Sequence, residues 1–210
     1  MKKILFASCL VAFLSNTSFA QSKIRMGFLA GVNYADYSKI SGIELSPKIA
    51  FLAGISSEIK IKEKLFITAD LYFERKRSES KVYGQDITSG RDLYLIAQND
   101  YVVLPVKIKY EFKKLDTFYL TGGFYSAYLV NSYFYDGFGN DTYSNRFKKL
   151  DFGVCFGIGK SFNITPDSRI NIELCESAGL TNIDTQGYFG EGNITTNSLS
   201  LICGYSFDFK

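Results

Sequence analysis

The sequence predicts an all-β fold, an eight-stranded antiparallel up-and-down transmembrane β-barrel. Three observations lead to this prediction. Apolar and polar residues alternate in one segment after another, each segment is long enough for a tilted strand to cross a membrane, and the connections alternate between short and long. Outer-membrane barrels show such alternating connections because short turns lie on their periplasmic side and long loops on the outer side.

The clearest segment is 101–112, with the sequence YVVLPVKIKYEF. Its even positions, from Val102 to Phe112, are all apolar or aromatic, whereas its odd positions end in Lys107, Lys109 and Glu111. A period of two places these sets on opposite faces of one strand. Pro105 cannot donate a hydrogen bond to a neighbouring strand, so a bulge or local break is expected there.

Seven further segments follow the same design and complete the predicted strands: 25–37, 47–60, 65–75, 118–130, 149–160, 169–180 and 198–209. Short turns join some of these segments. Three long polar segments, which are expected to be loops, separate others: 76–100, 131–148 and 181–197.

The distribution of charge predicts which face meets lipid. The apolar face has essentially no charge in its central span, so it is expected to face hydrocarbon, and the opposite face to line the lumen. Glycines on the charged face of 149–160 would leave room for long side chains in a narrow lumen. The predicted lumenal charges are Asp70, Glu74, Lys107, Lys109, Glu111, Lys149, Asp151, Arg169 and Glu173. A soluble barrel or sandwich, with its apolar face inside, is the alternative.

Buried charges must be paired, because isolated ones cost many kcal/mol. Asp70, Lys107 and Glu173 lie near mid-height of their strands and are expected to share one network. The main prediction is therefore a lumen plugged by salt bridges, and a gated polar path is the alternative.

The first 20 residues resemble a secretory signal peptide. Lys2 and Lys3 precede an apolar stretch, and Ser18-Phe19-Ala20 is a small-x-small cleavage site. We expect cleavage near Ala20, a single barrel domain over residues 21–210, and a location in the outer membrane of a Gram-negative envelope.

The composition argues against several classes of function. There is no histidine, which excludes Ser-His and Cys-His nucleophile pairs and His-ligated metals. A net charge of +3 gives no electrostatic case for nucleic acid. We therefore expect no enzyme activity, cofactor or metal. Cys155 and Cys175 are predicted to face the lumen on neighbouring strands, either as two small lumenal residues or as a cross-strand disulfide.

Several segments carry a resemblance to PorT-like, or "porin family", eight-stranded outer-membrane barrels: 31–34 (GVNY), 51–54 (FLAG), 58–61 (EIKI), 101–110 (YVVLPVKIKY), 151–153 (DFG) and 157–159 (GIG). The ending 204–209 (GYSFDF) is similar to the C-terminal signal read by the barrel-insertion machinery, although Lys210 follows the last aromatic residue. The resemblance implies a barrel in the outer membrane, with lipid and that machinery as partners. It does not establish a pore.

The leading functional hypothesis is a non-enzymatic barrel that serves as an anchor, with long loops that bind a protein or glycan. Aromatic residues in these segments suit recognition, but they also suit interfacial girdles on extended strands. They are Tyr83, Tyr94, Phe134, Tyr135, Phe138, Tyr143, Tyr188 and Phe189. A narrow channel for small solutes and a soluble ligand-binding barrel are the alternatives.

Overall fold

The computed structural model describes residues 24–37, 46–85, 92–112, 117–135, 140–141, 147–185 and 193–209. For residues 81–85, 92–95, 134–135 and 140–141 it describes the backbone. The predicted signal peptide lies outside the described residues, as do Phe138, Tyr143, Tyr188 and Phe189. The described residues contain no helix with the length and apolar character needed to cross a membrane.

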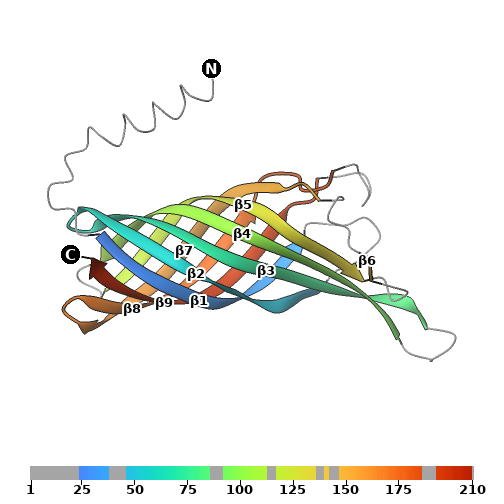
Figure 1. Cartoon of the computed structure of the whole chain (residues 1–210), viewed down its shortest axis with the longest axis horizontal. Helices are drawn as coiled ribbons and strands as arrows, with labels where there is room; N and C mark the ends of the chain where they lie inside the picture. The colour runs from blue at the N-terminus through green and yellow to red at the C-terminus, as the bar shows by residue number, and fades with distance from the viewer. Residues whose placement is uncertain are drawn as a thin grey trace, which may run out of the picture.

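Eight long strands form a closed antiparallel ring, which confirms the predicted fold class (Figure 1). They are β1 (Ile24–Tyr37), β2 (Ser46–Lys62), β3 (Leu65–Gln85), β4 (Asp92–Phe112), β5 (Phe118–Tyr135), β7 (Leu150–Thr165), β8 (Ser168–Gly179) and β9 (Thr196–Phe209). The two-residue strand β6 (Asn140–Asp141) pairs with the end of β5. Pairing of β9 with β1 closes the ring. We call the end that holds Ile24 and Phe209 the lower end and the opposite end the upper end.

The ring closes with a stagger that tilts its strands. A path from residue to directly paired residue can be followed once around the ring. It starts at Tyr34 of β1, crosses each of the other seven strands in turn, and returns to β1 at Ile24, ten residues lower (34 minus 24). The path passes Leu199, Glu176, Phe156, Gly122, Ile108, Ile67 and Ile59. A shear of this size requires strands inclined to the barrel axis, by about 35–45° in barrels generally.

Several strands extend further than predicted, β3 and β4 by the most. β3 and β4 continue to Gln85 and from Asp92, so most of the segment 76–100, expected to be a loop, is a hairpin that extends past the rest of the barrel (Figure 1). Tyr83 and Tyr94 therefore lie in strands, and Phe134 and Tyr135 lie in the extended β5. The alternation of apolar and polar residues is absent from the extension, because residues 76–81 of β3 are all polar and residues 93–97 of β4 are all apolar or aromatic, whereas backbone pairing continues.

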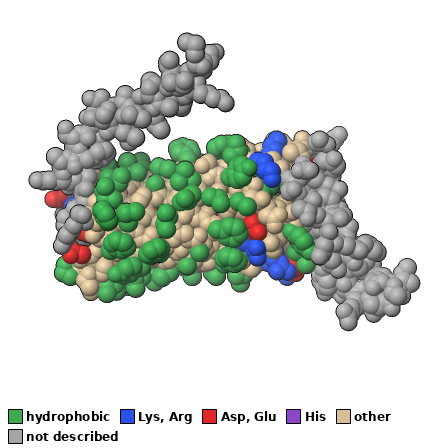
Figure 2. All heavy atoms as spheres, viewed as in Figure 1, with side chains coloured by type: hydrophobic (Ala, Val, Ile, Leu, Met, Phe, Trp, Pro, Cys, Tyr) green, Lys and Arg blue, Asp and Glu red, His purple; other side chains and the backbone are tan. Residues whose placement is uncertain are grey.

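The outer surface carries a belt of apolar side chains between charged groups at its two ends (Figure 2). Every strand of the ring contributes exposed apolar residues to this belt, among them Phe28, Phe51, Leu71, Leu104, Phe124, Phe156, Leu174 and Leu201. The predicted assignment of faces therefore holds along the strands. Glu176 is an exception, because it is an exposed carboxylate on this apolar face of β8.

Glycines on the inner face make room for large side chains in the narrow lumen. A Cβ atom at Gly159 would lie 2.3 Å from the ring of Tyr119, and one at Gly157 would lie 2.5 Å from Oε1 of Glu173. Gly159 of β7 is paired with Tyr119 of β5, and Gly157 is a diagonal neighbour of Glu173 in β8. The small residues are therefore needed where the interior is most crowded.

Pro105 interrupts pairing without shifting it. The register between β3 and β4 is the same on both sides of the proline, but Asp70 and Leu71 have no paired partners in β4. The expected local break is therefore present and the alternative, a bulge, is not. A register shift in β4 lies instead between Asp100 and Tyr101, against β5.

Candidate functional site

The lower half of the lumen is crossed by a continuous chain of alternating charges. Arg169 contacts Glu111 at 2.7 Å, and Glu111 contacts Lys109 at 3.3 Å. Lys109 contacts Glu58 at 2.7 Å, and Arg25 contacts both Glu58 at 2.7 Å and Asp208 at 2.5 Å. The six side chains come from β8, β4, β2, β1 and β9, so the chain connects opposite walls of the barrel.

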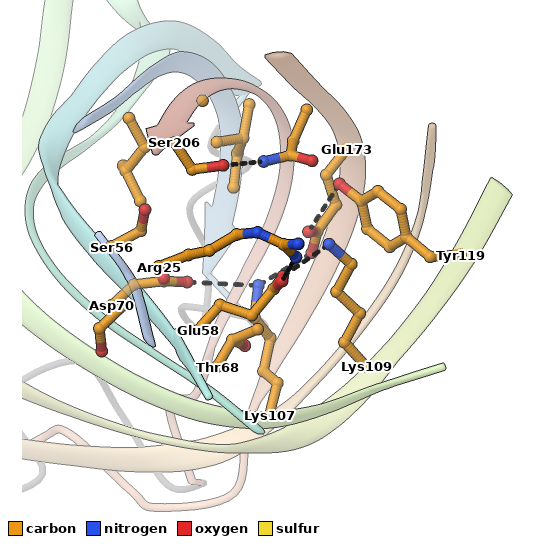
Figure 3. Close-up of a pocket in the computed structure, with 15 residues that line it drawn as sticks. Arg25, Ser56, Glu58, Thr68, Asp70, Lys107, Lys109, Tyr119, Glu173 and Ser206 are labelled. Carbon is orange, nitrogen blue, oxygen red and sulfur yellow. Dashed lines mark hydrogen bonds and ion pairs between the residues drawn. The ribbon is translucent and has the colours of Figure 1, made fainter. Parts of the chain in front are cut away.

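Lys107 lies near mid-height and joins two carboxylates. Its Nζ atom lies 2.9 Å from Oε1 of Glu173 and 3.5 Å from Oδ2 of Asp70, and all three side chains are buried. Glu173 also accepts hydrogen bonds from the hydroxyl groups of Thr121, at 2.9 Å, and Tyr119, at 3.4 Å. Figure 3 shows Asp70, Lys107, Tyr119 and Glu173 converging on the lumen from several strands. Together with the six charges below them, Asp70, Lys107 and Glu173 form what we call the lower network.

A cavity of about 60 Å³ lies within the lower network. It is lined by members of that network and by uncharged polar residues, including Ser56, Thr68, Asn171 and Ser206 (Figure 3). This volume is enough for a few water molecules. The hydroxyl group of Thr68 is buried without a protein partner and faces this space.

The upper half of the lumen is organised around Asp151, which is completely buried. Its carboxylate accepts hydrogen bonds from the hydroxyl groups of Thr181 (2.7 Å), Thr196 (2.8 Å) and Tyr125 (3.2 Å). No cation among the described residues forms an ion pair with it. Nζ of Lys76 donates to Thr196 Oγ1 at 2.9 Å, so a hydroxyl group separates the lysine from the carboxylate.

Lys76 also has aromatic and acidic neighbours. Its Nζ atom lies 5.4 Å from the ring centroid of Tyr101 and 5.8 Å from that of Tyr125. Glu74 lies 3.9 Å away and accepts hydrogen bonds from Asn33 and Ser198, each at 2.8 Å. We call this group the upper network. Its members are Asn33, Glu74, Lys76, Tyr101, Tyr125, Asp151, Thr181, Thr196 and Ser198.

Residues from the connections around β7, β8 and β9 cover the upper network. Phe147, Ile183 and Ile194 are buried and belong to one apolar cluster with Tyr37, Tyr101 and Leu129. The backbone N–H of Ile183 donates to Ile194 at 2.8 Å, and that of Lys148 donates to Ile183 at 2.7 Å. We call these segments, residues 147–148, 181–184 and 194, the cap. The cap is attached to Asp151 through the hydroxyl group of Thr181.

The structure places eight of the nine predicted lumenal charges on the inner face and divides them between the two networks. Glu74 and Asp151 lie in the upper network and the other six in the lower. The prediction for Lys149 is wrong: its side chain is exposed, because β7 begins only at the next residue.

Sequence reasoning missed several members of the networks. Arg25 and Asp208 lie at the ends of their strands, Glu58 is not among the predicted lumenal charges, and Lys76 lies in a segment expected to be a loop. The available signal was the alternation of inward and outward positions along each strand. Arg25 lies an even number of residues before Leu29 and Asn33, which both face inwards, so it is expected to face inwards too.

The two lumenal cysteines are buried and free. Cys155 pairs with Ser177, and Cys175 pairs with Gly157, so the two thiols are diagonal neighbours instead of facing each other. Direct pairing of the two cysteines would need a turn centred at residue 165 (half of 155 plus 175), whereas the observed register centres it at residue 166 (half of 155 plus 177). Among the described residues, no three acidic or cysteine side chains are arranged to hold a metal ion.

Comparison with known structures finds similar barrels at low sequence identity. Neisserial surface protein A matches at 14% identity over 89% of this chain and 97% of that chain, with a TM-score of 0.46. Ail of Yersinia pestis matches at 12% identity over 87% and 98%, with a TM-score of 0.46. OprG of Pseudomonas aeruginosa matches at 14% identity over 90% and 95%, again with a TM-score of 0.46.

No curated protein matches the chain. The model of a protein family, described as the outer membrane protein beta-barrel domain, matches residues 19–185. This match covers most of the sequence and agrees with the closed ring and its apolar outer belt. The chain therefore belongs to the outer membrane β-barrel domain family.

Proposed function

We propose that this protein is a non-enzymatic anchor in the outer membrane, with a closed lumen and an outer end that binds a protein or glycan. The observation that carries the proposal is the lower network, whose ion pairs connect opposite walls of the barrel. A solute moving through the lumen would have to separate these pairs. Breaking a buried ion pair by removing one partner costs about 3–5 kcal/mol, so such separation is rare.

The upper half supports the same proposal independently. Ile183, Ile194 and Phe147 are almost completely buried above the upper network, so the lumen is covered at this end as well. Eight-stranded barrels in general have an interior just wide enough for side chains to fill.

Conductance in planar lipid bilayers tests the closed lumen. The refolded mature chain is expected to give no stable unit steps, because the two halves are closed separately. The double variant Lys107→Ala/Asp151→Ala weakens both halves, and we expect short, irregular openings from it. Lys60→Ala, at an exposed position, is the matched control and should behave as the wild type. Stable, large unit steps from the wild-type chain would contradict the closed lumen.

The extended β3–β4 hairpin supports binding at the outer end. It continues for about ten residues beyond Arg75, a length of roughly 30 Å at 3.3 Å per residue. Ile24 and Phe209 lie at the opposite end, which has the short turns typical of the periplasmic side, so in this proposal the hairpin is directed away from the cell.

Deletion of residues 86–91, or of 136–146, tests the binding role. Each deletion should leave insertion and heat-modifiable gel mobility unchanged, because the ring of strands is intact. We expect at least one of them to abolish adhesion of the producing cells to a protein or glycan surface. Adhesion that is unchanged in both variants would contradict the binding role.

A narrow channel for small solutes is the second candidate, and the cavity in the lower network is the observation that favours it. The signal peptide, the PorT-like resemblance and recognition of the C-terminal strand by the barrel-insertion machinery remain predictions. Mass spectrometry of the mature N-terminus, with Gln21 expected first, tests the signal peptide.

A further inference from the structure

Glu176 places a carboxylate on the lipid-facing wall of the barrel. Along β8 it follows the exposed residues Ile172 and Leu174, whereas Glu173 and Cys175 between them point inwards. Its direct neighbours on the adjacent strands are Phe156 of β7 and Leu199 of β9. Both neighbours are exposed large apolar residues, so Glu176 is surrounded by the belt.

Glu176 does not lie at the edge of this belt. Towards the upper end, the apolar face of β7 continues beyond Phe156 with Phe152 and Leu150, which are 46% and 51% exposed. Leu180, directly after β8, is 68% exposed. Because apolar side chains lie above and below it, Glu176 is at a depth that hydrocarbon occupies.

No hydrogen bond or ion pair involves the carboxylate of Glu176 among the described residues. Among the cations around the belt, Lys160 lies between Phe118 and Phe162 near the lower end, and Arg75 pairs with Asp100 near the upper end. Lys148 and Lys149 are exposed just before β7, beyond Leu150. An ionisable group within a membrane segment is expensive unless it has a partner, and it usually marks a functional site.

The surroundings of Glu176 include one more polar side chain. Asn197 of β9 is exposed and pairs with Ala178, the next outward residue of β8 after Glu176. Glu176 and Asn197 are therefore diagonal neighbours, about 7–8 Å apart in strand pairs generally. Ala178 is small, so another surface can approach both hydrogen-bonding groups closely.

We propose that Glu176, Ala178 and Asn197 form the centre of an interface between two copies of this chain in the membrane. Copies inserted in the same direction place Glu176 at the same depth, so a two-fold axis along the membrane normal brings the two carboxyl groups together. A neutral carboxyl group is both a hydrogen-bond donor and an acceptor. Two such groups satisfy each other, and Phe156, Leu174 and Leu199 pack around them. A symmetric interface of this kind needs no second type of surface.

Förster resonance energy transfer in phosphatidylcholine vesicles tests the interface. Two populations of the chain carry a donor or an acceptor fluorophore attached after Lys210. The wild type should associate, and Glu176→Leu should associate about tenfold more weakly, through loss of a hydrogen bond within the bilayer. Glu176→Gln keeps a donor and an acceptor and should associate as the wild type does. Glu63→Leu, the same change in the turn between β2 and β3, is the matched control and should have no effect.

Heat-modifiable gel mobility confirms that each variant is folded, so loss of association is separable from loss of the barrel. Absence of energy transfer in the wild type at every lipid-to-protein ratio would overturn the proposal. Equal association of the wild type and Glu176→Leu would also overturn it, since the copies would then meet elsewhere. Association lost in both Glu176→Leu and Glu176→Gln would overturn the hydrogen-bonded pair.

Discussion

The two halves of the lumen hold buried charge in different ways. In the lower network, four cations face five carboxylates, and ion pairs connect them from wall to wall. In the upper network, a single described cation, Lys76, accompanies two carboxylates, and hydroxyl groups supply most of the hydrogen bonds to Glu74 and Asp151. The lower half contains a cavity, whereas aromatic and aliphatic side chains fill the upper half.

The difference indicates two ways to make a narrow lumen stable. Charge paired with charge tolerates nearby water but depends on every partner being present. The stability of a carboxylate that is hydrogen-bonded by hydroxyl groups depends on the apolar residues that cover it and exclude water. Substitutions in the lower half should therefore act through lost charge pairing, and those in the upper half through the cap.

The largest effect is expected from Lys107→Met. The change leaves Asp70 and Glu173 buried without their shared cation, and it should lower the free energy of unfolding by about 3–5 kcal/mol. Urea titration in lipid vesicles, with the folded fraction read from gel mobility, measures it, because the chain has no tryptophan for fluorescence. Lys60→Met, which is exposed, should change the value by less than about 0.5 kcal/mol. A loss below about 1 kcal/mol for Lys107→Met would show that the pairing contributes little.

Asp151→Asn should have the next largest effect, because hydrogen bonds to a charged group contribute about 1.5–3 kcal/mol and an amide cannot accept from all three hydroxyl groups. We expect a loss of about 2–3 kcal/mol and faster hydrogen exchange at the amides of Ile183 and Ile194, since the cap loses its attachment. Tyr125→Phe removes only the longest of the three bonds and is the milder control. Unchanged exchange in the cap would contradict this role of Asp151.

Gly157→Ala should weaken the lower half by overpacking. The added Cβ lies 2.5 Å from Oε1 of Glu173 and 2.6 Å from Oγ1 of Thr121, so it displaces Glu173 from Lys107. The expected loss is about 1–3 kcal/mol in the same urea titration. Gly204→Ala is the matched control, because its Cβ would extend towards the cavity with the nearest atom 3.6 Å away. Equal losses for the two variants would argue against crowding as the cause.

The smallest effect is expected from removing buried hydroxyl groups that have no protein partner. Tyr101→Phe, in the apolar upper half, should raise the free energy of unfolding by about 1 kcal/mol. Thr68→Val, in the lower half, should leave it nearly unchanged, because water in the cavity can satisfy the hydroxyl group. Destabilisation by Tyr101→Phe would mean that the upper half is hydrated too.

The alternation of residue types was sufficient to predict the eight strands and the direction of most side chains. The even-numbered residues from Val102 to Tyr110 face outwards, and Lys107 and Lys109 face inwards, because a period of two leaves no other choice once the fold is a barrel. The same rule pointed Glu176 outwards. Glu176 was not predicted as a lipid-facing charge, because the apolar face was expected to have essentially no charge in its central span.

Pairing across the lumen could not be predicted in the same way. Whether Glu173 of β8 meets Lys107 or Lys109 of β4 depends on the stagger of the closed ring, which no single strand encodes. The extensions of β3 and β4 were missed because residues 76–81 are all polar and residues 93–97 are all apolar or aromatic, so neither segment shows the alternation typical of a strand, although their backbones pair. The assignment of Lys149 failed by one residue at a strand end.

The contact between β1 and β9 has a consequence for how the protein is made. It joins Ile24 to Phe209, the first and last residues of the strands, which are 185 positions apart (209 minus 24). While the ribosome is still producing the chain, β1 has only β2 as a partner and the seam stays open. The barrel can be completed only after β9 has been synthesised, so the emerging chain must be kept from aggregating until that strand is available.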